Sequence, residues 1–118
     1  MTHDSLSELT ERVRQFAVAR DWEQFHAPKN LAMGVSAEAG ELAAEFQWLT
    51  GEESCAPDAE RLARIRHEAA DVLLYLVRLA DRLDFDLVAA ANAKIDLNGE
   101  KYPAEKVRGS ATKYDLRT

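Results

Sequence analysis

The feature that most constrains the fold is a long run, residues 58–83, in which apolar residues recur every three or four positions. This spacing places apolar side chains on one face of a helix. The face comprises Leu62, Ile65, Ala69, Val72, Leu76, Leu79 and Leu83. Leu73, Leu74 and Val77 extend the apolar cover to most of the circumference, as in helices buried on several sides. A chain of 118 residues has few helices to provide that burial, so we expect an all-α homo-oligomer.

Three further helices are predicted from capping residues and the same periodicity. The pattern Ser5-x-x-Glu8 begins a helix over about 5–20, and Pro28 begins one over about 28–50 that stops at Thr50-Gly51. Asp86 is a suitable N-cap for a helix over about 86–100. Residues 20–28 are predicted to form a loop with one helical turn, and residues 51–58 a polar loop. We therefore expect a four-helix bundle-like domain over residues 1–103 and a basic C-terminal tail over 104–118.

Charge and composition exclude several classes of partner. The formal net charge is −6, which argues against a nucleic-acid polymer or an anionic membrane surface as partner. Residues 1–13 are charged and do not resemble a signal peptide, and no apolar run approaches the length of a membrane span. Cys55 is the only cysteine, so no intrachain disulfide can form. We expect a cytoplasmic protein.

Two acid-x-x-acid pairs interrupt the apolar pattern, Glu38-Ala-Gly-Glu41 and Glu68-Ala-Ala-Asp71. Residues three apart share a helix face, with Cβ atoms roughly 5–6 Å apart. The small residues between the acids let another backbone approach, and like charges are costly to bury unpaired. If the helices over 28–50 and 58–83 pack antiparallel, we expect the four carboxylates to meet around a divalent metal. Mg²⁺ is the first candidate, because it prefers oxygen ligands.

Other interpretations of the acids stay open at this point. A Glu-x-x-Glu pair is commonly a solvated helix face, although these pairs are flanked by Ala and Gly rather than by Lys or Arg. A di-iron carboxylate site uses Glu-x-x-His on two helices, and this chain has Glu41 and Asp71 where the histidines would stand. Glu45 is either a third acid on the metal side or a surface residue. Cys55, the serines and the three histidines lack the context of an activated nucleophile.

Two aromatic residues follow the acids along their helices. Trp48 lies seven residues beyond Glu41, about 10 Å along the same stripe, and Tyr75 lies four residues beyond Asp71. Either one is also a reasonable core aromatic. Carboxylates that hold a metal, next to aromatics that stack on a flat ring, favour a nucleotide whose phosphates bind the metal.

The two acidic pairs together resemble the metal motif of the all-α nucleoside triphosphate pyrophosphohydrolases, the MazG-like superfamily. Longer stretches resemble its dCTP pyrophosphatase branch. These stretches are Arg20-Asp-Trp-Glu-Gln-Phe-His26, Pro28-x-Asn30-Leu31, Glu38-Ala-Gly-Glu-Leu-Ala43, Phe46-Gln-Trp48, Glu68-x-x-Asp-Val-Leu-x-Tyr-Leu76, Lys94-x-Asp96-x-Asn98 and Lys101-Tyr-Pro103. The resemblance covers roughly residues 12–103.

The resemblance implies Mg²⁺-dependent hydrolysis of a (deoxy)nucleoside triphosphate, dCTP or a modified dCTP, to the monophosphate and pyrophosphate. It implies metal ligands at Glu38, Glu41, Glu68 and Asp71, with Glu41 the candidate acceptor of the attacking water's proton. It implies a base and sugar pocket of Trp22, His26, Trp48 and Tyr75, and phosphate contacts from Lys94, Asn98 and Tyr102. Members are homo-oligomers, commonly tetramers. A dUTP-cleaving or broad triphosphate-cleaving relative and a catalytically silent helical oligomer with a binding or regulatory role are the alternatives.

Overall fold

The computed structural model describes residues 5–111, and this part of the chain contains helices and connecting segments but no strand. The all-α prediction is therefore confirmed for the described residues. The chain divides into two units, the first ending at Asp84 and the second beginning at Phe85. None of the helices within 5–111 is long and apolar enough to cross a membrane.

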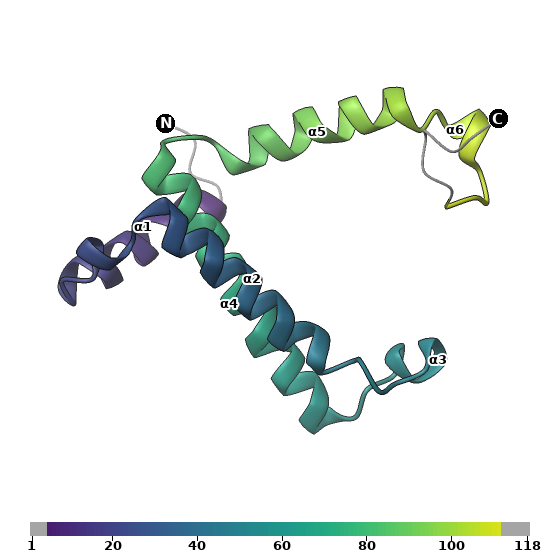
Figure 1. Cartoon of the computed structure of the whole chain (residues 1–118), viewed down its shortest axis with the longest axis horizontal. Helices are drawn as coiled ribbons and strands as arrows, with labels where there is room; N and C mark the ends of the chain where they lie inside the picture. The colour runs from purple at the N-terminus through teal and green to yellow at the C-terminus, as the bar shows by residue number, and fades with distance from the viewer. Residues whose placement is uncertain (1–4, 112–118) are drawn as a thin grey trace. The chain divides into compact units, whose positions relative to one another are not determined.

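The first unit is built around two antiparallel helices, α2 (Pro28–Ala44) and α4 (Ala59–Leu83), which lie side by side (Figure 1). Helix α1 (Ser5–Ala19) packs against α4, and the single 3-10 turn η1 (Glu23–Phe25) connects α1 to α2. The buried apolar side chains come from all three long helices and include Ala17, Leu31, Val77 and Ala80. The helices predicted over 5–20 and 58–83 and the helical turn within 20–28 are thereby confirmed.

Helix α4 owes its length and bounds to local signals at both ends. The Asp58 carboxylate accepts a hydrogen bond from the backbone N–H of Arg61, which satisfies one free donor of the first turn. At the other end Asp84 adopts the left-handed conformation (φ 56°), where its N–H bonds to the carbonyl of Ala80 and ends the helix. Between these two residues the chain forms a helix of 25 residues, over which the apolar periodicity continues.

The prediction of one helix over residues 28–50 is wrong at its C-terminal end. Helix α2 ends at Ala44, turns follow, and a short helix α3 (Gly51–Ser54) lies where a polar loop was expected. The Thr50 hydroxyl accepts from the N–H of Glu53, and the Glu53 carboxylate accepts from the N–H of Thr50. This reciprocal capping box starts a new helix at the position where the sequence pattern suggested that the old one stopped.

The second unit contains α5 (Leu87–Lys101) and the short α6 (Ala104–Val107). The Asp86 carboxylate caps α5 by accepting from the N–H of Ala89, as predicted for the helix over 86–100. Helix α6 falls within the predicted basic tail, whose residues 112–118 lie outside the described part. The division into a domain over 1–103 and a tail over 104–118 stays a prediction.

Candidate functional site

The two acidic pairs meet because α2 and α4 run antiparallel. Glu38 and Glu41 on α2 face Glu68 on α4, and each of the three offers a carboxylate oxygen within 4.8 Å of the others. Asp71, one turn further along α4, lies outside this group, although its charge acts on both Glu38 and Glu68. Three of the four predicted metal ligands are thus brought together, with the fourth beside them.

Two oxygens of this acidic group are buried without a hydrogen-bond donor. Oε2 of Glu38 and Oε2 of Glu68 are shielded from solvent and have no partner among residues 5–111. A buried carboxylate oxygen without a donor carries a large desolvation penalty, which a bound cation removes. Carboxylates alone, without cysteine or histidine, are ligands for hard cations such as Mg²⁺, Ca²⁺ or Mn²⁺. The acidic group therefore fits a divalent metal.

The electrostatics of the group favour the same conclusion. Burial raises the pKa of Glu38 above its usual value, and the carboxyls of Glu41, Asp71 and Glu68 raise it further. Burial likewise raises the pKa of Glu68, and the nearby carboxyls of Glu41, Asp71 and Glu45 raise it further. The carboxyls of Glu38 and Glu68 thus resist ionising, and a cation between them would reverse that effect.

A pocket of about 490 Å³ opens beside the acids, between α1, the connecting segment around η1, and the helices α2 and α4. Its lining includes four residues predicted from the sequence, Trp22, His26, Asp71 and Tyr75. Apolar side chains of α1 complete one wall. Because Asp71 of α4 is part of the lining, the pocket is next to the acidic group, and its aromatic side chains suit a flat ring.

Comparison with known proteins identifies the family. The sequence matches the MazG-like family over residues 34–116. This chain belongs to the MazG-like family. The relatives it resembles include dCTP pyrophosphatase 1 of Mus musculus and of Homo sapiens, each 44% identical over 93% of this chain. The chain spans 66% of the length of these curated relatives.

A solved structure gives the same assignment from the fold. A pyrophosphatase from Archaeoglobus fulgidus superposes with a TM-score of 0.80 at 36% identity, over 87% of this chain and 96% of that one. The MazG-like fold expected from the acidic motif is therefore supported by sequence and structure together.

One acid of the MazG-like protein is removed from the candidate metal ligands by its neighbours. Glu45 pairs with Arg64 at 3.1 Å and with Arg61 at 3.8 Å, and Arg61 also donates to the carbonyl oxygen of Glu45. Neither interpretation left open for Glu45 describes it fully, because it is a largely buried acid that pairs with two arginines. Glu38, Glu41 and Glu68 form no ion pair with an arginine within residues 5–111, which leaves their carboxylates available to a cation.

Trp48 is not where the helical pattern placed it. Because α2 ends at Ala44, Trp48 lies in the following turns with 87% of its surface exposed, and it does not extend the stripe of Glu41. Lys94 and Asn98 lie on α5 and Tyr102 is its C-cap residue, all within the second unit. The contribution of these four residues to substrate binding stays a prediction.

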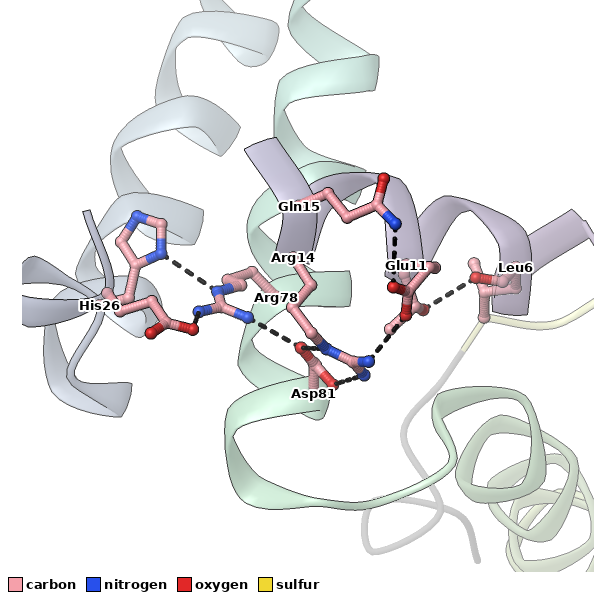
Figure 2. Close-up of polar contacts among 9 residues, drawn as sticks. Leu6, Glu11, Arg14, Gln15, His26, Arg78 and Asp81 are labelled. Carbon is pink, nitrogen blue, oxygen red and sulfur yellow. Dashed lines mark hydrogen bonds and ion pairs between the residues drawn. The ribbon is translucent and has the colours of Figure 1, made fainter. Parts of the chain in front are cut away.

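Arg78 is a pocket residue that the sequence reasoning missed. It lies on α4 with only 3% of its surface exposed, and its Nε–H donates to Nδ1 of His26 at 3.1 Å (Figure 2). Burial lowers the pKa of His26, and the charges of Arg78 and Arg82 lower it further against the opposing effect of Glu23. His26 is therefore a neutral group at neutral pH. The available signal was the spacing Arg78-x-x-Asp81, which pairs a buried cation with an acid one turn away.

Gly34 is required by the close approach of α2 to Tyr75. A Cβ atom at position 34 would lie 2.6 Å from Cδ1 and 2.8 Å from Cζ of the Tyr75 ring. We predict that Gly34→Ala displaces this ring, lowers stability by about 1–3 kcal/mol and weakens binding of the proposed nucleotide ligand. Urea unfolding and nucleotide titration measure the two effects. Gly40→Ala on the same helix is the control, because a Cβ there meets no atom within 4 Å; equal losses in both variants would contradict the prediction.

Proposed function

We propose that this MazG-like protein is a nucleoside triphosphate pyrophosphohydrolase that uses Mg²⁺ to convert dCTP, or a modified dCTP, to the monophosphate and pyrophosphate. The observation that carries the proposal is the acidic group with two buried, unpartnered oxygens, next to a pocket walled by aromatic rings. The mouse and human relatives named dCTP pyrophosphatase 1 and the A. fulgidus pyrophosphatase support this reaction class.

Different residues of the chain are proposed to bind the cation and the nucleotide. Glu38, Glu41, Glu68 and Asp71 would hold the cation, which supplies positive charge that offsets the charge of the triphosphate when bound. Trp22 and Tyr75 line the pocket and are suited to pack on the base and sugar. Exclusion of water from this apolar pocket strengthens the polar contacts made inside it.

Glu41 is the proposed acceptor of the proton from the attacking water. It is the exposed member of the acidic group, whereas Glu38 and Glu68 are half-buried. The water oxygen bonds to the α-phosphorus, the bond from that phosphorus to the bridging oxygen breaks, and pyrophosphate leaves. A carboxylate within reach of the water takes up its proton as the new bond forms.

The proposal includes a homo-oligomer, with a tetramer as the expected form, and phosphate contacts from Lys94, Asn98 and Tyr102 of the second unit. Support comes from large apolar side chains that remain exposed in the single chain. On α4 these are Leu62, Leu73, Leu74 and Leu83. Large apolar side chains gathered at the surface are typical of subunit contacts. Sedimentation of the native protein measures the subunit number. Location in the cytoplasm is part of the same proposal.

Pyrophosphate release from a panel of nucleotides tests the function. We expect release from dCTP and 5-methyl-dCTP with Mg²⁺ present, and loss of at least about a hundredfold in rate when EDTA removes the metal. Higher kcat/KM on dUTP, or equal values on all triphosphates, would reassign the substrate. Absence of release from every triphosphate, with nucleotide binding retained, would instead indicate a silent binding module.

A further inference from the structure

Buried Arg78 contacts the ring of His26 in a way that fixes the state of the imidazole. An arginine side chain has only hydrogen-bond donors, so the ring nitrogen that faces its Nε–H must be an unprotonated acceptor. That nitrogen is Nδ1 of His26, at 3.1 Å. The neutral imidazole consequently carries its proton on Nε2, the other ring nitrogen.

Arg78 is itself held in place from three elements. Its Nη1 donates to Oδ2 of Asp81 at 2.8 Å, and Asp81 also accepts from Nε and Nη2 of Arg14 on α1 at 3.1 and 2.5 Å (Figure 2). The third nitrogen, Nη2, forms no hydrogen bond among the described residues and lies 3.6 Å from Glu23 of η1. A guanidinium buried this deeply is stable only when paired, so the network leaves the arginine little freedom to turn.

We propose that Arg78 is a positioning residue that holds His26 as a neutral hydrogen-bond donor, with Nε2–H directed to an acceptor oxygen of the bound nucleotide. This inference rests on the proposed function. It assigns to the pocket a fixed donor, which selects ligands that place an acceptor oxygen there. His26 lines the pocket, whereas Arg78 acts through the histidine.

The charges around His26 agree with this role. The groups that face it or its pocket are Arg12 from α1, Glu23 from η1, and Asp71, Arg78 and Arg82 from α4. Burial is the main cause of the lowered pKa of His26, and the two arginines of α4 add to it. Arg82 donates to the backbone carbonyl of His26 at 3.3 Å, and within residues 5–111 its side chain forms no hydrogen bond with the ring. Of these two arginines, Arg78 is the one that bonds the ring.

Nitrogen-15 NMR of the free protein, without metal or nucleotide, tests the positioning step. The ring signals of His26 are identified by their loss in His26→Gln. We expect unprotonated Nδ1 and protonated Nε2 in the native protein. In Arg78→Met, which removes the donor but retains a long apolar stem, the Nδ1–H form should gain population and the pKa of His26 should rise towards its ordinary value. Arg82→Met is the matched control, in which the proton should stay on Nε2.

A kinetic measurement then tests the consequence for substrate. Arg78→Met should raise the KM for dCTP roughly three- to tenfold while kcat changes less than about twofold, because it weakens a binding contact. Arg78→Lys, which restores a donor, should recover part of the loss, and Arg82→Met should stay near the native KM.

The outcomes separate this inference from the proposed function. Protonated Nδ1 in native His26 would overturn the inference whatever the variants do, including a variant that fails to fold. An unchanged His26 ring in folded Arg78→Met would overturn it as well. If no triphosphate is cleaved, the proposed function fails while the NMR result on the free protein still stands.

Discussion

Replacing Glu41 with glutamine is expected to lower kcat/KM for pyrophosphate release at least about a hundredfold and to raise the melting temperature of the metal-free protein. The loss of activity follows because the variant removes a carboxylate that is both a proposed metal ligand and the proposed proton acceptor. The gain in stability follows because the carboxylate oxygens of Glu38, Glu41 and Glu68 lie within 4.8 Å of one another. Like charges at that distance repel, and glutamine removes one of them. Initial rates with Mg²⁺ and thermal melts in EDTA measure both effects.

Glu45→Gln is the matched control for this experiment. It also replaces an acid near the end of α2, but Glu45 is paired with Arg61 and Arg64. We expect its melting temperature to fall slightly, by the equivalent of about 0.2–1 kcal/mol, with activity changed only a few-fold. If Glu41→Gln instead destabilised the metal-free protein as Glu45→Gln does, the acidic group would not be under repulsion. Retained activity in Glu41→Gln would exclude its role as a ligand and proton acceptor.

Local signals predicted the helices well where a cap and a periodic face agreed. Asp58 and Asp86 cap the two helices that were predicted to begin at or beside them. The end of α2 was missed because apolar residues continue at helical spacing to Leu49, beyond the last helical residue Ala44. The competing signal was Thr50-x-x-Glu53, which supplies two reciprocal hydrogen bonds and starts α3. Periodicity alone does not reveal such a break.

The residues of the candidate site were likewise predicted only in part from the sequence. The meeting of Glu38, Glu41 and Glu68 was predictable, because acids spaced by three residues on two antiparallel helices can face each other. Arg78 was not, since an arginine on a helix is most often exposed. Its burial depends on His26, 52 positions away, and on the Arg14–Asp81 pair, which joins residues 67 positions apart. Contacts between such distant residues arise only when α1, η1 and α4 pack together.

Removing the Asp81 carboxylate is expected to be the most destabilising single change in this network. Asp81, with 11% of its side chain exposed, binds both Arg14 and the buried Arg78. Asp81→Ala would leave Arg78 with only the ring of His26 and the 3.6 Å ion pair to Glu23. We expect a loss of about 3 kcal/mol, since an uncompensated charge stays buried. Urea unfolding at pH 7 measures it, and Asp81→Asn, which keeps an acceptor, should lose less.

Glu11→Ala is the contrasting variant, because Glu11 binds the same Arg14 at 2.7 Å from an exposed position on α1. We expect a loss of at most about 0.5 kcal/mol when this surface pair is removed.

The pH dependence of the unfolding free energy further distinguishes Asp81→Ala from Glu11→Ala. The hydrogen bond from Arg14, with the charges of Arg14 and Arg78, holds the pKa of Asp81 below its usual value against the effect of burial. Its contribution is therefore complete above the unfolded pKa of about 3.9 and is lost as the pH falls through the lower folded pKa. The stability gap between native protein and Asp81→Ala should narrow in that acid window. A gap that stayed constant would mean that Asp81 stabilises the fold by packing rather than by its charge.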